Sequence, residues 1–151
     1  MTISDNTLFM SRALELAHVA QEAGEVPVGA VIVKDNQIIA EGWNRPISTS
    51  DPTAHAEIIA MRAAATSLNN YRLLDCTLYV TLEPCSMCAG AMVHARVKRL
   101  VYGATDPRAG AAGTIFNITD NSALNHRLEV APGIMAGECG TLLRNFFQVR
   151  R

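Results

Sequence analysis

Residues 77–94 read Thr-Leu-Tyr-Val-Thr-Leu-Glu-Pro-Cys-Ser-Met-Cys-Ala-Gly-Ala-Met-Val-His, and this segment gives a clear indication of the fold class. Its first part, Thr77–Thr81, is rich in β-branched and apolar residues, which predicts a short strand. Pro84 suits the first turn of a helix, and the residues after it predict a helix through about His94. A strand that passes directly into a helix is typical of α/β proteins. The stretch therefore predicts an α/β fold in which two cysteines stand at the start of a helix.

The rest of the chain also alternates between helices and short apolar strands. The predicted helices cover 6–23, Asp51-Pro52 to about Ser67, and the C-terminal residues from about Gly137, and the predicted strands cover Val28–Val33, Gln37–Glu41, Val97–Tyr102 and Leu128–Val130. Lys34-Asp35-Asn36 predicts a hairpin turn, and Trp43–Ser50 a polar loop. Residues 103–127 are rich in Gly, Asn and Asp, which predicts a long, mostly irregular segment with a functional role. This alternation indicates a mixed sheet covered by helices.

The composition fits one compact domain over residues 1–151. Of the 151 residues, 49% are hydrophobic and 18% are charged, which is enough apolar material for a core and excludes a disordered chain. No internal repeat, low-complexity tract or linker divides the sequence. A chain of this length has the usual size of a single domain.

Charge is unevenly distributed along the chain, although the total is close to zero. The net charge of −1 argues against binding of nucleic acid by bulk electrostatics. Residues 1–75 hold 5 basic and 9 acidic groups, whereas residues 76–151 hold 8 basic and 5 acidic groups. Arginine, which forms planar bidentate contacts with phosphate, supplies 11 of the 13 basic residues. The pattern predicts a small basic rim in the second half of the chain.

The N-terminal sequence and the hydropathy predict a cytoplasmic protein. Residues 1–6 lack the basic and apolar regions of a secretory signal, and no apolar run reaches the roughly 18 residues of a membrane span. The four cysteines, at positions 76, 85, 88 and 139, are then not expected to form disulfides. Their spacing favours metal or redox chemistry instead.

Two short segments supply a candidate zinc site: His55-Ala56-Glu57, and Cys85 with Cys88. Both segments lie at a predicted helix start, where side chains lean beyond the helix end and can converge on one target. The dipole and the unpaired N–H groups of a helix N-terminus favour thiolate over thiol. One imidazole and two thiolates suit zinc best. His55, Cys85 and Cys88 are therefore the predicted zinc ligands.

Glu57 is the predicted catalytic residue beside that site. Three protein ligands leave a fourth position for water, which is the arrangement of catalytic rather than structural zinc. Zinc lowers the pKa of bound water to about 7, and a carboxylate that is not a ligand can take up and deliver the water proton. His-x-Glu and Pro-Cys-x-x-Cys together match the signature of the zinc nucleobase deaminases.

Simpler interpretations of individual residues stay open. A lone Cys-x-x-Cys also occurs in redox pairs and structural zinc sites, so a non-catalytic module is one alternative. Cys76 or Cys139 could supply a fourth ligand, although both fit packed thiols better. His18, His94 and His126 fit structural or surface positions better than ligand positions.

The chain resembles the bacterial tRNA-specific adenosine deaminases, a family within the cytidine/deoxycytidylate deaminase superfamily, from about Leu8 to Arg150. The deaminase signature identifies only the superfamily, and the segments around it carry the closer resemblance. These segments are Glu25-Val26-Pro27-Val28-Gly29-Ala30-Val31, Gly42-Trp43-Asn44-Arg45-Pro46, Asp51-Pro52-Thr53-Ala54-His55-Ala56-Glu57, Leu78-Tyr79-Val80-Thr81-Leu82-Glu83-Pro84-Cys85, Met87-Cys88-Ala89-Gly90-Ala91-Met92, Gly110-Ala111-Ala112-Gly113, Asn125-His126-Arg127 and Phe146-Phe147.

The resemblance implies a cytidine-deaminase-like fold, which is a three-layer α/β/α sandwich with a five-stranded mixed sheet flanked by helices. It also implies a homodimer with one zinc ion per subunit and with a tRNA anticodon stem-loop as substrate. In such enzymes zinc-activated water and a glutamate proton shuttle convert the wobble adenosine, flipped into a pocket, to inosine.

The resemblance further assigns substrate contacts by position. Asn44, Val28 and Ala56 are expected at the flipped nucleoside, Asp106 and Arg108 at the anticodon backbone and sugars, and Phe147 with the terminal Arg150 and Arg151 beside the entering RNA. From spacing alone, Phe146 and Phe147 fit core positions of the last helix, and one of them is expected to be buried. A deaminase of a free base or nucleotide is the alternative enzyme, because a small substrate needs neither the loop around residues 106–113 nor an aromatic and basic C-terminus.

Overall fold

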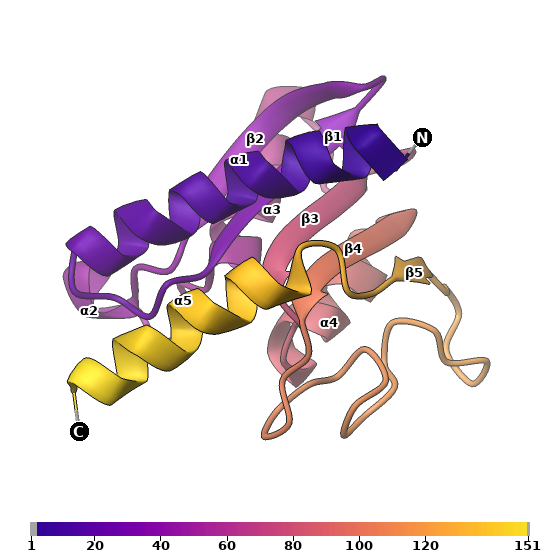
Figure 1. The fold of residues 1–151 in the computed structure, drawn as a ribbon. Coiled ribbons are helices and arrows are strands. Elements are labelled where there is room, and N and C mark those ends of the chain that lie inside the picture. Colours follow the sequence, from indigo (N-terminus) through magenta and orange to yellow (C-terminus); the bar gives the residue numbers. More distant parts are fainter. Residues whose placement is uncertain (1–2, 151) are drawn as a thin grey trace.

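The computed structural model describes residues 3–150, so Arg151 lies outside the described residues. Figure 1 shows a sheet with helices on both of its faces. In chain order the elements are α1 (Ile3–Glu22), β1 (Gly29–Lys34), β2 (Gln37–Trp43), α2 (Pro46–Thr49), α3 (Ala56–Leu68), β3 (Thr77–Leu82), α4 (Ser86–His94), β4 (Arg99–Ala104), β5 (Glu129–Ala131) and α5 (Ala136–Val149). This architecture confirms the predicted three-layer α/β/α sandwich.

The sheet is mixed and has five strands in the order β2-β1-β3-β4-β5. β1 is antiparallel to both β2 and β3, and β3, β4 and β5 run parallel to one another. The β1–β2 connection is the predicted hairpin, in which Asp35 and Asn36 adopt the positive φ angles of a tight turn. The parallel strands bring their carboxyl ends to one edge of the sheet, where β3 passes into α4.

The core lies on both faces of the sheet because side chains alternate along each strand. In β1, Ala30 and Ile32 belong to the core under α3 and α4, whereas Val31 and Val33 belong to the core under α1. Figure 1 shows the same division, with α1 and α5 on one face and α3 and α4 on the other. This double burial explains why the inner strands are almost continuously apolar.

Two glycines allow a helix to pack closely on each face. A Cβ on Gly29 would lie 2.0 Å from the carbonyl oxygen of Ala13 in α1, and a Cβ on Gly42 would lie 2.4 Å from the carbonyl oxygen of Ala56 in α3. No side chain fits either gap. The second contact holds the start of α3 against β2, which fixes the place of the candidate site.

Two local predictions were wrong. The helix predicted from Asp51-Pro52 begins later, at Ala56, and is α3. Asp51 instead forms a turn, in which its carboxylate accepts hydrogen bonds from the N–H and hydroxyl of Thr53. The segment predicted as a polar loop contains the short helix α2, which Pro46 opens. The other elements begin and end within three residues of their predicted bounds. Within residues 3–150, no helix has both the length and the apolar character needed to cross a membrane.

Candidate metal and catalytic site

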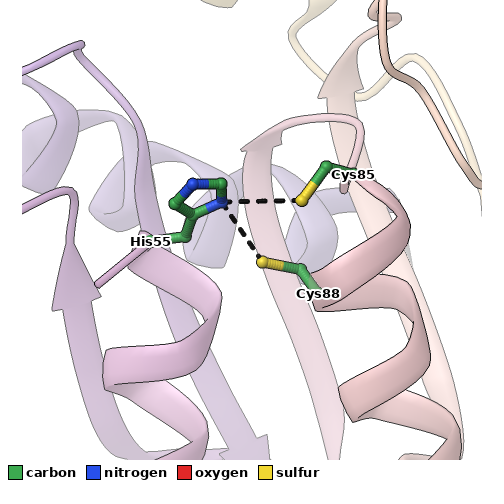
Figure 2. Close-up of side chains that lie close together, drawn as sticks. All are labelled: His55, Cys85 and Cys88. Atoms are coloured by element: carbon green, nitrogen blue, oxygen red, sulfur yellow. Dashed lines mark hydrogen bonds between the residues drawn. The ribbon is translucent and has the colours of Figure 1, made fainter. Parts of the chain in front are cut away.

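The three predicted zinc ligands converge at the starts of α3 and α4. The Nδ1 atom of His55 lies 3.6 Å from the Sγ atom of Cys85 and 3.5 Å from the Sγ atom of Cys88. Figure 2 shows the imidazole from one helix start facing both sulfurs from the other. Among the described residues, these three form the one group of His, Cys, Asp or Glu side chains whose geometry could hold a metal ion.

These distances fit zinc. With Zn–N near 2.0–2.1 Å and Zn–S near 2.3 Å, a tetrahedral ion would place the nitrogen and each sulfur about 3.6 Å apart. The observed separations of 3.6 Å and 3.5 Å match that value. One imidazole and two thiol sulfurs are also the donor set of a zinc site with an open fourth position. The residues present therefore fit one zinc ion per chain.

The backbone explains why the ligands meet. His55 is the N-cap of α3 and Cys85 is the N-cap of α4, and both have extended backbone angles and make no side-chain cap hydrogen bond. Their side chains are therefore left to point past the helix ends, and Cys88 lies in the first turn of α4 on the same side. The N–H groups of these helix starts add positive potential at the site.

The electrostatics favour a thiolate at Cys85. Hydrogen bonding to Cys88 and to His55, which outweighs burial, lowers the pKa of the Cys85 thiol to about 3. The same contact with Cys85, together with burial, raises the pKa of Cys88. The hydrogen bond to Cys85 raises the pKa of His55, although burial opposes this. Because zinc ligands must be deprotonated, a bound zinc ion would displace the remaining protons of this cluster.

Glu57 stands beside this cluster without belonging to it. Its side chain is 4% exposed, and it makes a hydrogen bond with Cys88. Burial raises the pKa of Glu57 to about 7, which the hydrogen bonds and the neighbouring His55 only partly offset. A carboxyl group with a pKa near neutrality can both accept and donate a proton.

A cleft of about 1000 Å³ opens onto the site and brings together most of the predicted contact residues. Its lining includes His55, Glu57 and Cys85 and the predicted substrate residues Val28, Asn44, Asp106, Arg108 and Phe147. Ala56 does not line the cleft; it is fully buried, and its backbone N–H donates to Oδ1 of Asn44 at 2.8 Å. Residues of α5 that the sequence did not single out, Gly140 and Leu143 among them, complete the wall.

Residues at the mouth of the cleft have distinct environments. The carboxylate of Asp106 accepts hydrogen bonds from the N–H groups of Arg108 and Ala109, so it shapes its own loop. Arg108 is exposed and has no ion-pair partner among the described residues. Phe147 is 45% exposed, whereas Phe146 is buried, which confirms that one of the pair belongs to the core.

The remaining cysteines and histidines have structural positions. Cys76 and Cys139 are buried in the apolar cores and lie outside the metal cluster, as expected for packed thiols. Nε2 of His126 lies 2.7 Å from the carbonyl oxygen of Val97, and His18 and His94 are exposed. None of them adds a fourth ligand.

Glu25 is a buried supporting residue that residue chemistry alone did not reveal. Its side chain is 1% exposed, and its carboxylate accepts hydrogen bonds from the N–H groups of Ile47 and Ser48 in α2. It therefore anchors the segment that follows Asn44. An acidic residue directly before the apolar run at Val26 was the only sequence signal for a buried carboxylate.

Comparisons with known proteins agree with this fold and site. Residues 3–104 match the family model described as the cytidine and deoxycytidylate deaminase zinc-binding region. The chain is 59% identical over 143 residues to the tRNA-specific adenosine deaminase of Haemophilus influenzae, a match that covers 94% of this chain and 83% of that protein. It is 43% identical over 149 residues to the corresponding protein of Bacillus subtilis, with 99% and 92% covered.

Two solved structures show the same relationship in three dimensions. A structure from a study of A-to-I editing by tRNA:A34 deaminases at the wobble position of transfer RNA superposes with a TM-score of 0.88 at 44% identity, covering 91% of this chain and 99% of that one. A guanine deaminase from Nitrosomonas europaea superposes with a TM-score of 0.81 at 27% identity, covering 93% and 83%. Fold and site thus define a zinc-dependent deaminase. The chain belongs to the cytidine and deoxycytidylate deaminase family and, within it, to the tRNA-specific adenosine deaminases.

Proposed function

We propose that this protein hydrolyses the wobble adenosine of a tRNA anticodon to inosine and ammonia. The observation that carries the proposal is the buried, unligated carboxylate of Glu57 beside the His55, Cys85 and Cys88 cluster at the floor of the cleft. The substrate follows from the tRNA-specific relatives, which match nearly the whole chain.

In the reaction Glu57 moves protons. His55, Cys85 and Cys88 would hold the zinc ion, which would supply Lewis-acid activation of a water molecule. Glu57 accepts a proton from the attacking water and delivers it to N1 of adenine while the new C–O bond forms at C6. Glu57 then transfers the second water proton to the departing amino group, so that the C6–N bond breaks and ammonia leaves. The buried position of Glu57 beside the three ligands suits both transfers.

The other cleft residues bind the substrate. Nδ2 of Asn44 has no hydrogen-bond partner among the described residues and is available to the nucleoside, and the side chain of Val28 forms an apolar wall for the base. Arg108 offers an exposed guanidinium to the anticodon backbone. The exposed ring of Phe147 offers a stacking surface for an unpaired base. Ala56 contributes indirectly, by holding Asn44.

We also propose a cytoplasmic homodimer. Three large apolar side chains are exposed near the start of α4: Met87, Ile115 and Phe116. Met87 lies on α4, and the other two follow Ala111, whose N–H donates to the carbonyl oxygen of Pro84 just before α4. Such exposed apolar surface is typical of an interface, and a second copy of the chain is the occupant that the family implies. A cytoplasmic location suits both the tRNA substrate and the free thiols of the site.

A single assay tests the proposed substrate. Inosine formation is measured on an anticodon stem-loop bearing a wobble adenosine, and the same enzyme is given free adenosine, cytidine and guanine. We expect turnover on the stem-loop and little on the small molecules. Equal or better activity on a free base would instead favour a base deaminase such as the guanine deaminase neighbour. A monomer by analytical ultracentrifugation would contradict the homodimer.

A further inference from the structure

Glu83 is a buried carboxylate at the junction between β3 and α4, two residues before the ligand Cys85. Its side chain is 1% exposed. No Lys or Arg side chain forms an ion pair with it among the described residues. Burial of a charged group is costly unless hydrogen bonds replace the lost hydration. The hydrogen-bond donors that replace this hydration indicate the role of Glu83.

All of these donors come from one segment, residues 105–114, which we call the cleft loop. Oε1 accepts hydrogen bonds from the N–H of Asp106 at 3.0 Å and from Oγ1 of Thr114 at 2.5 Å. Oε2 accepts from the N–H of Ala112 at 3.0 Å and from the N–H of Thr114 at 3.1 Å. Residues 105–109 of this loop form one wall of the cleft. One carboxylate therefore binds the loop at both of its ends.

Gly110 shows how tightly the cleft loop wraps around this carboxylate. A Cβ at position 110 would lie 2.5 Å from both Cδ and Oε1 of Glu83. Any other residue would force the loop and the carboxylate apart. The close fit is a feature of the loop backbone, so it is independent of the hydrogen-bond donors.

We propose that Glu83 is a positioning residue, whose carboxylate holds the cleft loop so that Asp106 and Arg108 face the substrate. An amide would not replace it without loss. Turned one way, the NH₂ group of a glutamine would face the N–H groups of Ala112 and Thr114. Turned the other way, it could donate to the hydroxyl of Thr114 but would still face the N–H of Asp106. The identity of the substrate that the cleft loop contacts rests on the proposed function, whereas the role of Glu83 in holding the loop does not.

The test compares zinc-loaded wild type with Glu83→Gln, Gly110→Ala and a matched control, Glu129→Gln, which removes an exposed carboxylate on β5. The first readout is hydrogen–deuterium exchange without substrate. Glu83→Gln removes the charge from these hydrogen bonds, and Gly110→Ala pushes the cleft loop away from the carboxylate. Both variants should therefore exchange the cleft-loop amides at least roughly tenfold faster, with the exchange of α3 unchanged. Zinc content should stay at one per chain.

The second readout is kinetic. On the anticodon stem-loop, KM should rise roughly tenfold while kcat falls much less, because the loop binds substrate and does not transfer protons. Unchanged cleft-loop exchange in both variants would overturn the proposal. Loss of zinc, together with a fall in kcat as large as the rise in KM, would also overturn it. If Glu83→Gln does not fold, Gly110→Ala and Thr114→Val decide by the same readouts. Absence of stem-loop deamination by wild type would count against the proposed function alone, since the exchange experiment needs no substrate.

Discussion

The side-chain oxygen of Asn44 accepts a hydrogen bond from the backbone N–H of Ala56 at 2.8 Å. This contact ties the end of β2 to the first turn of α3, between the ligand His55 and the acid Glu57. It also satisfies an N–H group that helix geometry leaves without a partner. One side chain thus supports the helix start and lines the cleft.

We expect two substitutions of Asn44 to separate these roles. Asn44→Ala removes the acceptor, so the free energy of unfolding should fall by about 1 kcal/mol. A displaced helix start should also lower kcat roughly 10- to 100-fold. Asn44→Asp keeps the acceptor and removes the amide donor, so its melting temperature should stay near that of wild type while KM rises. Equal melting temperatures for Asn44→Ala and wild type would show that the hydrogen bond to Ala56 does not stabilise the fold.

Glu57→Gln should abolish proton transfer and leave the site intact. The amide has the same shape and cannot exchange protons, so kcat should fall roughly 10²- to 10⁴-fold. Because Glu57 lies outside the metal cluster, zinc content by elemental analysis should stay at one per chain. Zinc loss in this variant, or near-normal turnover, would refute the assigned role.

Cys85→Ala should release the metal, whereas Cys139→Ala should not. Both substitutions remove one thiol, but only Cys85 faces His55. We expect Cys85→Ala to lose most of its zinc and its activity. Cys139→Ala should keep both and lose about 1 kcal/mol of stability through the small cavity it creates. Equal zinc content in the two variants would contradict the ligand assignment.

The stabilising contribution of the Glu25 carboxylate should be lost in acid. Burial raises the pKa of its carboxyl group, but the hydrogen bonds from the N–H groups of Ser48 and Ile47 outweigh this and lower the pKa overall. The unfolded state therefore binds more protons than the folded state, and stability falls as pH drops below roughly 4.3 towards the folded pKa. Urea unfolding from pH 7 to pH 3 measures this slope.

The matched comparison for Glu25 uses Glu25→Gln and the exposed neighbour Glu22→Gln. The stability gap between wild type and Glu25→Gln should be largest near pH 7 and shrink in acid. Glu22→Gln should follow wild type throughout, which cancels acid effects common to all variants. A constant gap for Glu25→Gln would show that its carboxylate does not couple stability to pH.

The sequence predicted the layers and the metal ligands because both depend on local patterns. A short run of β-branched and apolar residues marks strands such as β3, and the pair Cys85 and Cys88 keeps its spacing on any helix start. The start of α3 was placed wrongly because Asp51-Pro52 has the composition of a helix start and is used here for a turn. Only tertiary contacts decide between those two uses.

The supporting residues could not be predicted for a related reason. Asn44 and Ala56 are 12 residues apart, and Glu83 reaches donors up to 31 residues away. A buried carboxylate satisfied mainly by backbone N–H groups needs no charged partner, so no basic residue signals its presence. Hydrogen bonds of this kind become visible only when the loop conformation is known.

The metal ligands also have a topological consequence. His55 and Cys85 are 30 residues apart, and the chain between them runs through α3 and β3. An ion shared by these side chains would link the two ends of that segment, and because the ligands meet only in the folded chain, the ion would stabilise the folded state. Metal affinity is then also folding energy. In a cell short of zinc, newly made chains would unfold more often and be degraded sooner, so the abundance of the enzyme would follow the zinc supply.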